Sequence, residues 1–226
     1  NNKSVVIISQ SSKNLNRISV ERGRGIGVNF KACISRSDSS TNMYYRILDL
    51  LIFTVWVIWS LILTRPKNIY VSTDPPLLIP FVVFLYSKIF RSSYVYHLQD
   101  IHPEAGKKII KLNSILLAFF KKIDGVVIRN ASSIITINET MRNEIIARSK
   151  TKSNIYLVDN PTANIVDIAK NKVPGFVFLG NAGRLQRIPL LLNSIKNYSE
   201  KGGTLPFLFI GEGVYFDEIR KLSCDY

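Results

Sequence analysis

The sequence predicts an α/β protein with parallel sheets in two domains. Three observations lead to this class. Short runs of β-branched and aromatic residues alternate with longer apolar segments of helical length over much of the chain. A polar, lysine-containing passage at about 161–174 interrupts the alternation, which then starts again. Finally, 46% of the 226 residues are hydrophobic, which is enough for the packed cores of one large or two small domains.

The first segments read as two short strands with a basic connection between them. Residues 4–9 and 28–34 are rich in Val and Ile, and the polar stretch 11–24 separates them. The glycine cluster at 23–27 leads into a strand and not into a helix, so it does not have the context of a phosphate-binding loop. We interpret it as a hairpin-like turn without a chemical role.

The most apolar region, residues 47–64, is predicted to be a helix. It is slightly shorter than the roughly 20 apolar residues that cross a bilayer. Asp49 lies at one end and a basic segment at 65–67 follows the other. We favour a buried or membrane-apposed helix, and a membrane-anchored protein stays as an alternative. Trp56 and Trp59 fit either a lipid headgroup level or a packed core.

The alternation is clearest between residues 68 and 158. Helices are expected at 77–90, from about 104 to 130, and from 138 onward, and strands at 68–72, 94–98, 133–137 and 154–158. Strands that alternate with helices form a parallel sheet, and the loops after the strands gather at one edge, where ligands bind. The break at 159–161 divides the chain into an N-terminal domain, 1–160, and a partial C-terminal domain, 161–226.

The second domain contains a strand, a glycine turn and an arginine-bearing entry into a helix, and this pattern favours anion binding. The turn consists of Gly180, Asn181, Ala182 and Gly183, and Arg184 and Arg187 follow it. Backbone amides at such a turn attract phosphate, and arginine grips two phosphate oxygens at once. An ordinary αβ turn with surface arginines is the competing interpretation. A second strand, 205–210, leads into Gly211 and Gly213, which would allow a ribose or base to approach the backbone.

A second candidate site lies after the strand at 94–98. Both histidines of the chain and two carboxylates fall within residues 97–104. Asp100 and His102 suit hydrogen bonding to sugar hydroxyls or acid/base chemistry. His97 is better explained as a satisfied core residue. The spacing lacks a helical metal-ligand pair, and we expect no metal.

The charge is strongly unbalanced, with 30 Lys and Arg against 16 Asp and Glu, a formal net charge of +14. Such a surface favours nucleic acid, an anionic membrane or phosphorylated substrates. A basic nucleic-acid-binding protein is the alternative from another class, but the cations scatter through every segment. Cys33 and Cys224 are far apart and read as reduced thiols of a cytosolic protein. The chain starts without Met or a signal peptide pattern, so both ends look like cuts in a longer frame.

Five stretches in order resemble the family 4 glycosyltransferases, which have the GT-B architecture of two Rossmann-like domains. They are residues 70–76, 99–104, 159–161, 180–184 and 211–213. Within that family, the sequence is similar to bacterial enzymes that build O-antigen and capsule, including those that transfer N-acetylfucosamine-type sugars. The resemblance covers most of the chain from residue 47 onward.

The resemblance implies transfer of a sugar from a nucleoside diphosphate donor, UDP-linked, with retention at the anomeric carbon and without a metal or cofactor. Arg184 would contact the leaving diphosphate, Arg187 is the nearest candidate for a second basic group, and Asp100 with His102 would face the acceptor. It further implies an undecaprenyl-diphosphate-linked acceptor in lipopolysaccharide O-antigen or capsule synthesis. The protein would then be cytoplasmic, peripheral to the inner face of the plasma membrane and attracted to its anionic surface, with no nucleic acid partner.

Two departures from the family pattern bear on activity. Residues 4–9 resemble the family's second strand, so its first strand and glycine-rich loop are not found here. The acidic E-x7-E signature that holds the donor sugar is also not found. We therefore expect this polypeptide, taken alone, to be a poor or inactive transferase.

Overall fold

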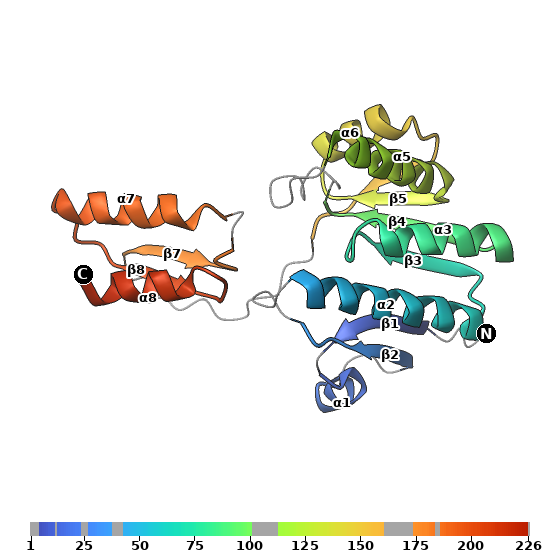
Figure 1. Ribbon diagram of the computed structural model, residues 1–226, viewed down its shortest axis with the longest axis horizontal. Coiled ribbons are helices and arrows are strands. Elements are labelled where there is room, and N and C mark those ends of the chain that lie inside the picture. The colour runs from blue at the N-terminus through green and yellow to red at the C-terminus, as the bar shows by residue number, and fades with distance from the viewer. Residues whose placement is uncertain are drawn as a thin grey trace. The chain divides into compact units, whose positions relative to one another are not determined.

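The computed structural model describes residues 5–11, 13–23, 27–37, 43–100, 113–160, 174–183 and 186–225. The chain separates into two compact units, Asn1–Asn160 and Pro161–Tyr226. Both units are α/β with parallel strands (Figure 1). Each unit is described separately below.

The described part of unit 1 contains two parallel sheets. In the smaller sheet β1 (Val5–Ser11) pairs with β2 (Val28–Ile34), so that Val5 lies opposite Val28. The larger sheet has the order β3-β4-β5-β6, and all of its strands are parallel. Its strands are β3 (Asn68–Ser72), β4 (Ser93–Leu98), β5 (Ser133–Thr136) and β6 (Asn154–Leu157). They are the four that the sequence predicts between residues 68 and 158.

The helices that connect these strands form a row of neighbours. The row runs through α2 (Met43–Thr64), α3 (Leu78–Phe90), α5 (Ser114–Asn130) and α6 (Glu139–Ser149), and each contacts the next. Because β3 to β6 follow one another in order, right-handed crossovers place α3, α5 and α6 on the same face of the sheet. Figure 1 shows α3 and α5 running along that sheet.

A single hydrophobic cluster joins α2, the larger sheet and β2. It includes Phe53 and Val57 of α2, Val71 of β3 and Tyr96 of β4. The cluster also holds polar groups that have partners. The Tyr94 hydroxyl donates to the Val127 carbonyl, and Arg148 forms an ion pair with Asp124 in which both side chains are nearly inaccessible. Buried polar groups are tolerated because they are paired in this way.

The connection between β1 and β2 differs from the sequence prediction. The structure places a helix, α1 (Leu15–Glu21), where a polar connection was expected, and β1 and β2 are parallel. The expected hairpin-like turn at 23–27 is therefore wrong, because a hairpin joins antiparallel strands. Asn14 starts α1, since its side chain accepts a hydrogen bond from the Arg17 amide at 3.1 Å. That capping residue was the sequence signal for α1.

In its described residues, unit 2 contains one pair of parallel strands and two helices. Its elements are β7 (Phe176–Leu179), α7 (Ile188–Glu200), β8 (Phe207–Ile210) and α8 (Phe216–Asp225). A small core of Ala182, Ile188 and Ile219 is completed by Phe178 and Phe209 from the strands. The order of strand, helix and second strand agrees with the sequence prediction for this domain.

Candidate functional site

The two glycine turns of unit 2 lie side by side because β7 and β8 are hydrogen-bonded neighbours. The Gly180 amide donates to the Ile210 carbonyl at 3.0 Å, and the Ala182 amide donates to the Glu212 carbonyl at 2.6 Å. In return, the Tyr215 amide donates to the Ala182 carbonyl at 3.1 Å. The turns are thus joined by backbone hydrogen bonds at the carboxyl edge of the two strands, where open α/β sheets bind ligands.

Close approach of the two turns requires glycine at 211 and 213. A Cβ on Gly211 would lie 1.9 Å from the Gly180 carbonyl oxygen, and one on Gly213 would lie 2.4 Å from Asn181 Oδ1. Both residues also have positive φ, 153° and 138°. The sequence predicts that these glycines allow a ligand to approach the backbone. The structure adds a second task, since they let one turn pack on the other.

The first turn also presents backbone donors. Within the part of unit 2 that the structure describes, the amides of Asn181 and Gly183 have no hydrogen-bond partner. Arg187 follows at the N-cap of α7, exposed and in the left-handed conformation with φ 51°. Free amides at the start of a helix attract anions. Arg184 lies outside the described residues.

The carboxyl edge of the larger sheet in unit 1 brings together two stretches that are 61 residues apart. The Gln99 side-chain amide donates to Asn160 Oδ1 at 2.9 Å, and the Gln99 backbone amide reaches Thr73 Oγ1 at 3.5 Å. Asp100 is exposed beside them. Sequence reasoning placed Gln99 and Asn160 in separate motifs and did not predict their contact. His102 lies outside the described residues.

His97 differs from the expectation of a satisfied core residue. It sits half-buried on β4, where its Nδ1 is in hydrogen-bonding contact with the hydroxyl of Tyr70 on β3. Its Nε2 is buried and has no partner among the described residues. Burial lowers the pKa of His97, which favours the neutral ring. Only one ring nitrogen is therefore satisfied in the part of unit 1 that the structure shows.

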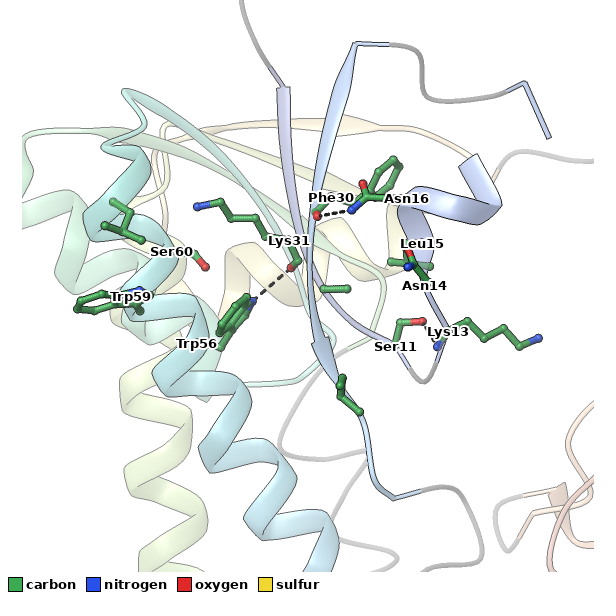
Figure 2. Close-up of a pocket in the computed structure, with 13 residues that line it drawn as sticks. Ser11, Lys13, Asn14, Leu15, Asn16, Phe30, Lys31, Trp56, Trp59 and Ser60 are labelled. Carbon is green, nitrogen blue, oxygen red and sulfur yellow. Dashed lines mark hydrogen bonds between the residues drawn. The ribbon is translucent and has the colours of Figure 1, made fainter. Parts of the chain in front are cut away.

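A cavity of about 530 Å³ lies between β2, α1 and α2 (Figure 2). Its wall combines lysines 13 and 31 with the rings of Trp56 and Trp59. Figure 2 shows Trp56 between α2 and β2, where its Nε1 donates to the Lys31 carbonyl at 3.3 Å, and Trp59 on the side of α2 that points away from β2. Sequence reasoning noted the tryptophans but not the cavity, because it depends on the unpredicted helix α1.

No group of three or more His, Cys, Asp or Glu side chains that could hold a metal ion is found among the residues the structure describes.

Comparison with known proteins bears on the fold. No family model matches the chain, and no curated protein matches it. Among solved structures, it is similar to UGT89C1 of Arabidopsis thaliana in complex with UDP-L-rhamnose, with TM-score 0.55 and 9% identity over 93% of this chain and 61% of that chain. It is also similar to HepE of Anabaena in complex with UDP, with TM-score 0.53 and 14% identity over 99% of this chain and 66% of that chain.

The chain thus spans less than two thirds of UGT89C1 and about two thirds of HepE. At identities of 9% and 14% these likenesses show the fold alone. They agree with the parallel strands of both units, and the α/β fold of GT-B type that the sequence predicts is confirmed.

Proposed function

We propose that this chain is part of a glycosyltransferase that takes a sugar from a nucleoside diphosphate donor, with the diphosphate at the turns of unit 2. One observation carries the proposal: two mutually packed glycine turns, with the Asn181 and Gly183 amides open, lie at the carboxyl edge of β7 and β8. The fold supports it, because the two similar solved structures were determined in complex with UDP or UDP-L-rhamnose.

The chemistry assigned to the turns is stabilisation of the leaving group. When the bond between the sugar and the phosphate breaks, negative charge grows on the diphosphate. Fixed cations and open amides lower the energy of that transition state more than that of the ground state. In this proposal Arg184 contacts the diphosphate, Arg187 is the second cation, and the turn Gly180–Gly183 with Gly211 and Gly213 holds the nucleotide.

The acceptor side of the proposal belongs to unit 1. Asp100 and His102 are assigned to the acceptor, and the contact between Gln99 and Asn160 fixes the backbone next to Asp100. Because the chain resembles O-antigen and capsule enzymes, the proposed acceptor is an undecaprenyl-diphosphate-linked sugar at the inner face of a bacterial plasma membrane. Retention at the anomeric carbon and independence from metal are parts of the same proposal, and so is a cytoplasmic, peripheral location.

Nucleotide titration with a matched variant tests the donor site. The variant Arg184→Ala removes a cation at the turn. Lys196→Ala removes one on α7 that lies nine residues beyond the N-cap Arg187, about 13.5 Å along the helix. We expect calorimetry to show that UDP binds and that Arg184→Ala weakens it by about tenfold or more, as for a lost charge-assisted phosphate contact. Lys196→Ala should bind as the parent does. Equal affinities in parent and Arg184→Ala would refute the site.

A further inference from the structure

The outward face of α2 is an exposed apolar surface of unit 1. Within the described residues, Tyr44–Thr64 is the one helix long and apolar enough to cross a membrane, and only a third of its most apolar 18-residue stretch is buried. Val55 is 66% exposed, and Trp59 and Leu63 are each 57% exposed. An apolar groove of about 400 Å³ runs along this face, lined by Leu51, Ile52, Val55, Trp56 and Trp59. A surface of this kind marks an interaction site.

Three polar side chains of α2 point the other way. Asp49, Thr54 and Ser60 are buried on the protein side. Asp49 accepts hydrogen bonds from Ser37, and the Thr54 hydroxyl donates to the Leu50 carbonyl at 2.7 Å. The arrangement is the reverse of that of a water-facing helix, which turns its polar residues outward. The outward face therefore offers its partner a surface without charged side chains over its middle turns.

The packing of α2 excludes a span and favours a position in the membrane plane. Phe53, Val57 and Leu61 are each less than 5% exposed and belong to the core shared with β3 and β4. A spanning helix would carry β1 and β2, which contact α2, into the hydrocarbon, where open sheet edges are not tolerated. An interfacial helix buries one face in lipid and keeps the other on its protein.

Charge and aromatic residues indicate an anionic bilayer as the partner. Basic residues stand exposed at both ends of the apolar face, with Arg46 near the start and Arg65 and Lys67 after the end. The chain has a net charge of +14, which attracts anionic lipid. Its two tryptophans, Trp56 and Trp59, both lie on α2, beside the cavity that Lys31 lines. Tryptophan prefers the headgroup level.

We propose that the outward face of α2 is a membrane-docking surface that lies in the plane of an anionic phospholipid bilayer. The apolar groove takes up acyl chains, and the basic residues at both ends of the helix contact phosphate groups. This deepens the proposed function, which requires access to a lipid-linked acceptor. Docking itself does not involve a nucleotide, so an experiment can refute membrane docking without refuting the nucleotide site, and the reverse.

Tryptophan fluorescence reports on this face, because the chain has two tryptophans, Trp59 is exposed on the face and Trp56 lines its groove. The full chain is mixed with vesicles of phosphatidylcholine and phosphatidylglycerol, with and without brominated acyl chains. We expect a blue shift, quenching by the brominated lipid, and weaker binding at high salt or without phosphatidylglycerol. Absence of quenching and of co-sedimentation would overturn the proposal. So would a blue shift that depends on protein concentration without lipid, accompanied by dimerisation in analytical ultracentrifugation.

A pair of matched variants then locates the surface. Val55→Gln with Trp59→Gln changes two exposed apolar residues one helical turn apart, and Ile115→Gln with Phe119→Gln does the same on α5, where they are 78% and 56% exposed. We expect the α2 pair to lower the vesicle partition coefficient by about a hundredfold and the α5 pair to leave it unchanged. Circular dichroism checks that both variants fold. Equal losses in both would overturn the assignment to α2.

Discussion

The larger sheet of unit 1 and the strand pair of unit 2 are both built from strands rich in apolar residues, but the side chains of these strands are buried to different extents. In unit 1, Tyr96 and Ile134 are at most 1% exposed, because neighbouring strands and a row of helices enclose them. In unit 2, α7 and α8 cover the phenylalanine side of β7 and β8, whereas Leu179 and Leu208 on the other side are 75% and 55% exposed. Two strands with helices on one face bury little. The unit that carries the proposed donor site is thus the less enclosed one.

The difference predicts that the largest loss of stability comes from the interior of unit 1. Replacing Arg148 by Met removes the cation of a buried ion pair, and breaking such a pair costs about 3–5 kcal/mol. Urea unfolding followed by tryptophan fluorescence measures it, since both tryptophans lie in unit 1. The double variant Arg148→Met with Asp124→Leu should recover most of the loss. No change in the unfolding midpoint of Arg148→Met would contradict the account of this core.

Unit 2 should be most sensitive where its turns meet. Gly213→Ala places a Cβ 2.7 Å from the Ala182 carbonyl in a positive-φ residue, and such strain costs about 1–3 kcal/mol. Gly202→Ala is the matched control, because Gly202 also has positive φ, 83°, but nothing lies within 4 Å of the added Cβ. UDP affinity and thermal unfolding of both variants measure the effect. Equal UDP affinities in the two variants would show that nucleotide binding does not depend on the packing of the two turns.

A smaller effect is expected at the buried tyrosines of unit 1. Burial raises the pKa of Tyr94 and of Tyr96. Their contribution to stability is therefore complete below the unfolded value of about 10 and is lost as pH rises above it. Tyr94→Phe should lower the free energy of unfolding by about 1 kcal/mol at neutral pH, which is the contribution of the hydrogen bond to the Val127 carbonyl. It should also reduce the loss of stability above about pH 10. Unfolding at graded pH with tyrosinate absorbance checks this, and ionisation of all tyrosines near pH 10 would contradict it.

The smallest effect concerns Asp49, which links α2 to the end of β2. The Ser37 hydroxyl and the amides of Arg36 and Ser37 hold the pKa of Asp49 below its usual range. A lowered pKa contributes stability that is present above the unfolded value of about 4 and is lost as pH falls through the folded one. Asp49→Asn should therefore flatten the acid side of the stability profile of unit 1. An unchanged acid limb would show that other carboxylates govern it.

Much of the fold was accessible from the sequence because its signals are local. Runs such as 68–72 and 133–137 are β-branched and bounded by turn residues, and their strands occur as predicted. The helix α1 was missed because it has only seven residues, and its cap at Asn14 was the clearest signal for it. Short helices rely on tertiary contacts, which a sequence pattern does not display.

The candidate sites were accessible only in part. The sequence located the glycine turns of unit 2, since glycine next to a strand end is a local signal. It did not show that Gly211 and Gly213 are needed for contact between the turns, because that depends on the pairing of β7 with β8. The contact of Gln99 with Asn160 and the cavity beside Lys31 arise from residues distant in the chain, and no local pattern encodes them.

The central claim, a diphosphate at the turns of unit 2, is tested most directly by the backbone amide signals in nuclear magnetic resonance during a UDP titration. The account predicts that the amides of Asn181, Gly183 and Gly213 shift most, and that those of β4 to β6 in unit 1 do not move. It also predicts that uridine, which lacks phosphate, shifts the Asn181 and Gly183 signals much less. Shifts confined to unit 1, or unchanged Asn181 and Gly183 signals at saturating UDP, would contradict the claim.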